Sequence, residues 1–411
     1  MEKSSLFIKS PEKGTGVFGA VYYCENDSLR LENLYNMTSQ SDAPNQAFVR
    51  YSNDNGKNWS APKALDALEI LDNGIKRIYH RGGYLDKKSG RYICIRNEGY
   101  FPSEKYDPNI CMRSLQLHYR VSENGGRSFI VDEPIIQDGA EFDADHPLSG
   151  VWKGKNSVML GDFSCRPLTR KDGAILVPCQ ISPVDENGNY HNPGNGYTYH
   201  EAAVIIGTWT KEKKLKWKLS QMLRGNPQTT TRGLLEPTLA FLSDGSILMV
   251  MRGSNEAMIS RNPDKAAPLP GITGSKWYSI SHDGGETWEK ACPWTYDNDE
   301  EFNSPSACSE LLNHSNGKIY WLGNITSGLT NGNSPRYPLV LGEVNSQSGL
   351  LRKDSCRIID DRRPGEPANM TLSNFHAYED RETGEIVLHM PRLGTREIFL
   401  EADLLEYRIK V

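Results

Sequence analysis

The sequence predicts an all-β fold, a six-bladed β-propeller built from four-stranded antiparallel blades. One hairpin module recurs roughly every 70 residues along the chain, which is typical of a propeller. A second turn motif follows several of these hairpins, and no segment has a convincing helical period. We expect a single domain spanning residues 1–411, with seven blades as the alternative count.

The repeated module is a polar entry, a strand, a tight glycine turn and a second, apolar strand. In five copies the turn glycine follows Ser, Asp, Asn or Thr, and these glycines are Gly90, Gly173, Gly245, Gly317 and Gly384. Such hairpin turns need a positive φ, which glycine adopts without strain. We expect a sixth, degenerate copy around residues 17–26, and we expect residues 5–10 to add a strand to the last blade and close the ring.

The second motif has the pattern S-x-D-x-G-x-x-W and occurs after strands. An Asp or Asn side chain caps the turn, the glycine takes the left-handed conformation and the aromatic ring packs between sheets. Two copies fit the pattern and a third fits it loosely. Their defining residues are Ser52, Asp54, Gly56 and Trp59, then Ser281, Asp283, Gly285 and Trp288, and in the looser copy Ser122, Asn124, Gly126 and Phe129.

This motif is the Asp-box, and with the repeats it makes the whole chain resemble the sialidase (neuraminidase) superfamily of Asp-box, or BNR-repeat, propellers. The resemblance implies that the Asp-boxes lie on outer hairpins and do no chemistry. It also implies a central pocket, because the inner strands of a propeller converge on its axis. The chain is therefore expected to be an enzyme that acts on a glycan.

Residues just before each hairpin are neighbours in a propeller, although they lie far apart in the sequence. Here these positions are charged more uniformly than ordinary strand starts. They are His80, Arg81, Arg166, Arg232, Glu236, Glu310 and His376. We therefore expect these side chains to line one pocket.

The resemblance assigns roles to some of these residues. The segment from Gly233 through Glu236 to Arg252 looks like the one that carries the catalytic glutamate and the second arginine of the family. By the same resemblance Arg81, Arg252 and Arg336 would hold a sugar carboxylate through charge-assisted bonds. Asp107 falls where the family has its general acid.

Two features depart from the family pattern. The tyrosine nucleophile should precede the last hairpin, where this sequence reads Thr-Leu-Ser-Asn-Phe-His from Thr371 to His376. The Ile-Pro that should follow Arg81 is replaced by Gly-Gly. The resemblance therefore transfers the fold better than the tyrosine mechanism.

Three functions stay open at this point. The first is an exo-acting, sialidase-like glycoside hydrolase that removes a terminal acidic sugar. The second is a polysaccharide lyase that cleaves a uronic-acid glycan by β-elimination, and the third is a glycan-binding propeller without catalysis. The lyase would use a His or Tyr base beside arginines, drawn from His80, Tyr199, His200, His376, Arg166 and Arg232.

Composition excludes several other classes. A net charge of −5 provides no basic field for nucleic acid, and no apolar run is long enough to span a membrane. The eight cysteines show no metal-ligand spacing, so we expect no cofactor and no metal, and a structural Ca²⁺ has no dedicated ligand motif. The sequence as written indicates a cytoplasmic protein, or a periplasmic or secreted one if a leader has been removed.

Overall fold

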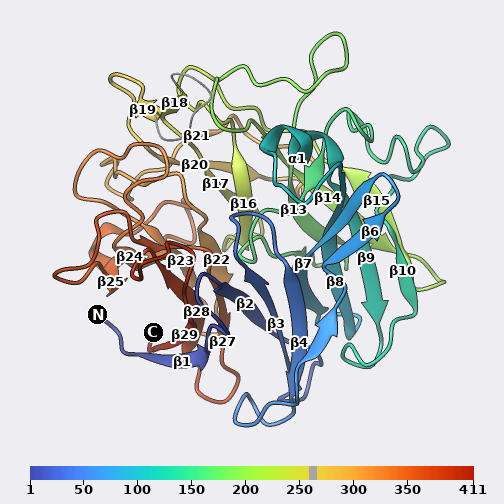
Figure 1. Ribbon diagram of the computed structural model, residues 1–411, viewed down its shortest axis with the longest axis horizontal. Helices are drawn as coiled ribbons and strands as arrows, with labels where there is room; N and C mark the ends of the chain where they lie inside the picture. The colour runs from blue at the N-terminus through green and yellow to red at the C-terminus, as the bar shows by residue number, and fades with distance from the viewer. Residues whose placement is uncertain (259–265) are drawn as a thin grey trace.

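A computed structural model describes residues 1–258 and 266–411. Its main sheets are six, all antiparallel, and they stand in a ring (Figure 1). The predicted six-bladed β-propeller is therefore confirmed, and the sixth copy predicted around residues 17–26 is the start of the first blade. Apolar side chains pack between successive sheets, as in the cluster that joins Ile93 and Tyr119 to Val177 and Trp217.

The bounds of the blades follow the sequence order. The first blade comprises β2 (Gly16–Tyr23), β3 (Leu31–Thr38), β4 (Gln46–Ser52) and β5 (Lys63–Leu65). The second comprises β6 (Leu68–Leu71), β7 (Gly74–Asp86), β8 (Arg91–Phe101), β9 (Gln116–Ser122) and β10 (Val131–Pro134), with helix α1 (Pro108–Ser114) between β8 and β9. The third comprises β11 (Val158–Met159), β12 (Leu168–Thr169), β13 (Ile175–Ile181), β14 (Glu201–Trp209) and β15 (Leu215–Leu219).

The other three blades follow the same plan. The fourth comprises β16 (Leu235–Phe241), β17 (Ile247–Arg252), β20 (Lys276–Ser281) and β21 (Cys292–Pro293), and a small pair, β18 (Glu256–Met258) and β19 (Ala266–Pro268), lies between β17 and β20 in the sequence. The fifth comprises β22 (Glu310–Asn313), β23 (Ile319–Asn324), β24 (Leu339–Val344) and β25 (Arg357–Asp360), with a 3-10 turn, η2 (Lys353–Ser355), before β25. The last comprises β26 (Thr371–Leu372), β27 (His376–Glu379), β28 (Ile386–Leu393), β29 (Leu404–Ile409) and β1 (Ser4–Ile8).

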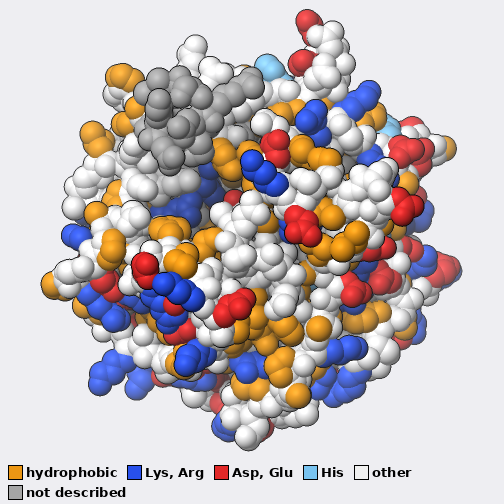
Figure 2. Space-filling model, in the orientation of Figure 1, with side chains coloured by type: hydrophobic (Ala, Val, Ile, Leu, Met, Phe, Trp, Pro, Cys, Tyr) orange, Lys and Arg blue, Asp and Glu red, His pale blue; other side chains and the backbone are white. Residues whose placement is uncertain are grey.

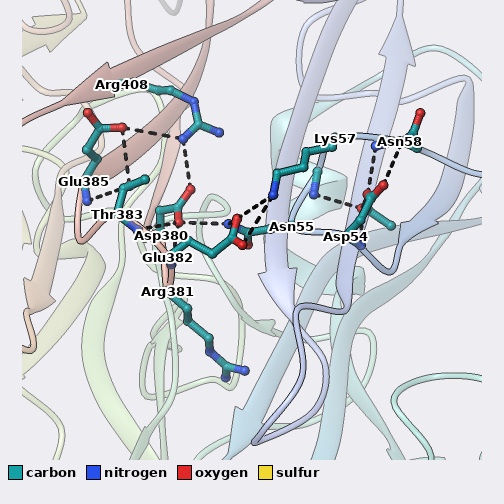
Figure 3. A network of polar contacts seen from close by, with 12 residues as sticks. Asp54, Asn55, Lys57, Asn58, Asp380, Arg381, Glu382, Thr383, Glu385 and Arg408 are labelled. Carbon is teal, nitrogen blue, oxygen red and sulfur yellow. Dashed lines mark hydrogen bonds and ion pairs between the residues drawn. The ribbon is translucent and has the colours of Figure 1, made fainter.

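The N-terminal strand closes the ring, as the sequence predicted. Strand β1 pairs antiparallel with β29, so both ends of the chain lie in the last blade (Figure 1). A polar network also ties the first blade to the last (Figure 3). The Asn55 side chain donates to the carboxylates of Asp380 at 2.9 Å and Glu382 at 3.0 Å, and Arg408 donates to Asp380 at 2.9 Å.

The three Asp-box-like turns share one position and one hydrogen-bond pattern. Each follows the strand that pairs with the last strand of its blade, which is β4, β9 or β20. In the turn after β20, the Ser281 hydroxyl donates to Asp283 at 2.9 Å and accepts from the Gly285 amide at 2.8 Å. Asp283 in turn accepts from the Thr287 amide at 2.9 Å. The same bonds recur after β4 and β9, so the looser copy folds like the other two.

The aromatic residue of this turn is a test of its structural role. Trp288 is buried in the core between the third and fourth blades, whereas Trp59 is half-buried. Trp288→Ala is expected to lower the free energy of unfolding by about 3–5 kcal/mol, because it removes a large buried ring. Trp59→Ala should cost less, and denaturant unfolding measures both. Equal midpoints for wild type and Trp288→Ala would contradict this role.

Acidic and basic side chains are mixed over the face shown in Figure 2, and Lys or Arg side chains also lie inside a hollow of that face. Within residues 1–258 and 266–411, we find no helix with the length and apolar character that a membrane span requires.

Candidate active site

All six blades contribute to one cavity, with a volume of about 480 Å³. This size falls within the range of small-molecule binding sites. The polar side chains that line it come from every blade in turn: Asn36, Tyr79 and Arg81, Asp162 and Gln180, Glu236 and Arg252, Asn333 and Arg336, and Thr371 and Asn374. The cavity thus lies where the inner strands converge.

Four arginines line this cavity: Arg81, Arg232, Arg252 and Arg336. Burial and the neighbouring Arg252 lower the pKa of Arg232 and of Arg336 to about 10, so both are still cationic at neutral pH. Buried cations that repel one another attract an anion strongly, because a bound anion relieves the repulsion. Guanidinium groups also match the planar shape of a carboxylate.

The segment of residues 305–307 holds two of these arginines. Arg252 donates from Nε to the Ser306 hydroxyl at 2.8 Å, and Arg336 donates from Nη2 to the Ser306 carbonyl at 3.0 Å. Arg252 also donates to Asn333 at 3.0 Å. Ser306 is buried, so both guanidinium groups are held by hydrogen bonds to a residue in the interior of the protein.

Glu236 enters the cavity from a distorted strand. The pairing of β16 with β17 shifts register between Leu235 and Thr238, and Glu236 has φ +46°, which is uncommon outside glycine. A bulge of this kind re-aims a side chain. The Glu236 amide donates to the Gln180 side chain at 2.7 Å, which helps to hold this conformation. Strain of about 1–3 kcal/mol at such a residue is common in active sites.

The Glu236 carboxylate is paired with Arg252. Its Oε1 accepts from Arg252 Nη1 at 2.9 Å, while Oε2 is buried with no hydrogen-bond partner in the described part of the chain. Burial alone would raise the pKa of Glu236, but Arg252 and Arg336 outweigh burial and lower it. Glu236 is therefore ionised at neutral pH, with one oxygen free to act.

Asp162 is the second buried carboxyl group of the cavity. The residue before it, Gly161, lies against Glu236, since a Cβ on Gly161 would stand only 2.6 Å from Glu236 Cγ. Asn374 donates to Asp162 at 2.8 Å, and Asn97 fixes the preceding Leu160 through two hydrogen bonds. Burial and the charge of Glu236 raise the pKa of Asp162, although Arg81 acts in the opposite direction. Two carboxyl groups of one cavity thus have pKa values shifted in opposite directions.

His200 supplies a neutral imidazole to the same cavity. Its backbone pairs with that of residues 232–234, which places His200 beside Arg232. Burial, together with Arg232 and Arg252, lowers the pKa of His200 well below its usual value. Neither ring nitrogen has a hydrogen-bond partner among the described residues.

Searches by sequence find no match, either to a protein-family model or to a curated protein. Solved structures do match over nearly the whole chain. The NanB sialidase from Streptococcus pneumoniae matches with a TM-score of 0.61 and 15% identity, over 99% of this chain and 70% of that one. An intramolecular trans-sialidase from Ruminococcus gnavus matches with a TM-score of 0.60 and 12% identity, over 99% and 97%. The fold is that of the sialidases.

An α-L-arabinofuranosidase from Fusarium graminearum, Arb93A, matches with a TM-score of 0.54 and 12% identity, over 99% of this chain and 97% of that one. These three neighbours thus share the fold but have different activities. At these identities the likeness shows the fold alone, so the chemistry has to be argued from the cavity itself.

The cavity brings together six of the residues predicted from sequence: Arg81, Arg232, Glu236, Arg252, Arg336 and His200. Asp107, predicted as the acid, is not among the residues that line it. Its carboxylate caps helix α1 by accepting from the Asn109 amide at 2.8 Å. His80 lies outside as well, bonded to the Asp66 carbonyl at 2.9 Å, and the Tyr199 hydroxyl donates to the Gly225 carbonyl at 2.9 Å.

Three further predicted residues form a separate buried cluster. Glu310 accepts from the Ala377 amide at 2.9 Å and lies 3.1 Å from His376 Nδ1 and 3.4 Å from Arg166 Nε. His376 Nε2 also lies 3.2 Å from the Val21 carbonyl. These contacts join four blades, and none of the three predicted residues lines the cavity.

Sequence reasoning missed two acids of the cavity, Asp162 and Asp42. Asp162 stands in the stretch Met-Leu-Gly-Asp-Phe. An acidic residue among apolar ones, outside any turn motif, was the signal in the sequence that could have indicated it. Asp42 is exposed, in the loop between β3 and β4, with φ 58°. Within the described ranges, no group of three or more His, Cys, Asp or Glu side chains is arranged to hold a metal ion. The absence of a cofactor stays a prediction.

Proposed function

We propose that this protein is an exo-acting glycoside hydrolase that removes a terminal sugar carrying a carboxylate. One observation carries the proposal: four arginines line a cavity that also holds two buried carboxyl groups, Glu236 and Asp162. The arginines would bind the sugar carboxylate, and the two acids would act on the glycosidic bond. The sialidase fold supports the same reaction class.

The two acids would have different roles, because one would be protonated and the other ionised. Asp162, with its raised pKa, would donate a proton to the leaving oxygen. Glu236, ionised by Arg252, would stabilise the cationic transition state through the charge of its carboxylate. A water molecule would then add to the anomeric carbon and return a proton to Asp162. This arrangement needs no tyrosine at the start of the last blade, where Asn374 instead supports Asp162.

A second function is favoured by His200. A neutral imidazole beside Arg232 is suited to remove the proton next to a uronate carboxylate, as β-elimination requires. The lyase prediction from sequence relied on three histidines, of which His200 alone lines the cavity. The base would therefore be His200.

A product assay on a panel of sialylated and uronate-containing glycans tests these proposals. We expect release of an intact acidic sugar, with no gain in the ultraviolet absorbance that an unsaturated uronate would give. Glu236→Gln should abolish that release, and His200→Ala should only impair it by disturbing Arg232. The matched control is His191→Ala, an exposed histidine in the loop before β14. An absorbing product that disappears in His200→Ala would replace the hydrolase proposal with the lyase.

A further inference from the structure

Behind the arginines lies a lysine that the cavity does not expose. Lys276 has 0% of its surface accessible, and it stands directly opposite Arg252 in the pairing of β17 with β20. Like charges opposite each other destabilise a sheet, and an apolar side chain would fill this place at lower cost. The position therefore calls for a reason beyond packing.

The ammonium group of Lys276 binds the segment that holds the arginines. Its Nζ donates to the carbonyls of Pro305 at 3.4 Å and of Ala307. Between these two carbonyls lies Ser306, whose hydroxyl and carbonyl accept from Arg252 and Arg336. One buried cation thus fixes the short segment on which two cavity cations depend.

We propose that Lys276 is a positioning residue for anion binding: its ammonium group holds residues 305–307 so that Ser306 keeps Arg252 and Arg336 aimed at the cavity. The proposal rests on the proposed function only in taking the bound group to be a carboxylate. Lys276 touches no substrate. It acts through Ser306 and through its positive charge, which lies close to the cavity arginines.

This positioning depends on pH. Burial and the repulsion of Arg252 lower the pKa of Lys276 to about 7, with Arg336 adding to the repulsion while Cys308 and Glu236 oppose it. Above that pH the amine keeps only weaker, neutral hydrogen bonds, and the cluster loses one positive charge. A bound carboxylate favours the ammonium form, so anion affinity falls as pH rises through about 7.

Calorimetric binding of free N-acetylneuraminate to the full chain tests the proposal. Between about pH 6 and about pH 9 the dissociation constant of wild type is expected to rise about tenfold. Lys276→Met, which keeps the volume without the charge, should bind more weakly than wild type at low pH. Its dissociation constant should rise less with pH than that of wild type, and the remaining rise comes from Asp162. The matched control, Lys318→Met in the exposed hairpin between β22 and β23, should behave like wild type.

The stability of the fold provides a second readout that needs no ligand. Folded Lys276 loses its proton near pH 7, whereas the unfolded lysine keeps it until about pH 10.4. The unfolded state binds more protons between these values, so the stability of wild type relative to Lys276→Met should rise with pH in that window. Affinity and stability thus change with pH in opposite directions, which a merely structural lysine does not produce.

The binding and stability measurements distinguish a failure of the Lys276 proposal from a failure of the acidic-sugar proposal. If N-acetylneuraminate binds wild type and Lys276→Met with the same pH dependence, the positioning role is wrong. If it binds wild type at no pH, the acidic-sugar proposal fails, and acetate replaces it in the same comparison with the same expected difference. Should Lys276→Met not fold, Lys276→Gln takes its place, with the same weak pH dependence expected. A flat stability difference between wild type and variant overturns the proposal.

Discussion

Replacing Glu236 by Gln is expected to lower kcat by about 10²–10⁴-fold while KM changes little, because the substitution removes a charge that acts in the transition state. The carboxylate is ionised and has one oxygen without a partner in the described chain, so its charge is available to a developing cation. Steady-state kinetics on the sugar released in the product assay measure this loss.

The same substitution should leave the fold largely intact. The Gln amide oxygen can still accept from Arg252, and the backbone bond to Gln180 does not involve the side chain. We expect the melting temperature to fall by no more than about 5 °C. Glu289→Gln, an exposed glutamate of the same blade, is the control and should keep full activity. If Glu236→Gln keeps wild-type kcat, the carboxylate pair is not the catalytic centre.

The sequence could predict the fold because each blade repeats the same local chemistry. The five hairpin glycines all have positive φ, between 68° and 98°, which is the conformation that their turns require. The closing strand could be expected because a propeller leaves its last blade incomplete until one end of the chain pairs with it. These features depend on short-range patterns that a single sequence displays.

The repeat could locate only part of the site, because Arg81 lies inside β7 and Arg336 lies in the loop before β24. Glu236 and Arg252 flank the same hairpin, so the repeat located both of them. Arg166, Glu310 and His376 stand at strand entries too, yet they face one another rather than the cavity. Sequence spacing indicates which residues approach the axis, but it does not indicate which of them are neutralised by neighbours from other blades.

Loop residues follow tertiary contacts, which the repeat does not show. Asp162 is positioned by asparagines of two other blades. Asn97 bonds the Leu160 carbonyl, 63 residues away in the sequence, and Asn374 bonds the Asp162 carboxylate, 212 residues away. Asp107, in contrast, follows a local sequence pattern. An Asp before a Pro is typical of a helix start, and the Asp107 carboxylate does cap helix α1.

Replacing Arg232 by Met should separate binding from stability. Its Nη2 donates to the Thr198 hydroxyl at 2.7 Å, but its buried Nε has no partner in the described chain, and its charge is repelled by Arg252 and Arg336. Removing a desolvated and repelled cation should leave the melting temperature of the free protein unchanged or higher. Arg113→Met, at an exposed arginine of helix α1, is the control.

The cost of Arg232→Met should emerge only when an acidic sugar is present. A lost charge-assisted hydrogen bond corresponds to a dissociation constant about 10–150 times higher. At a sugar concentration about 100 times the wild-type dissociation constant, wild type should gain about 2.7 kcal/mol of stability, of which the variant would lose between about half and about nine-tenths. Thermal unfolding with and without the sugar measures both effects. A variant that is destabilised without sugar, yet gains as much from it as wild type does, would make Arg232 a structural residue and leave the anion site to Arg81, Arg252 and Arg336.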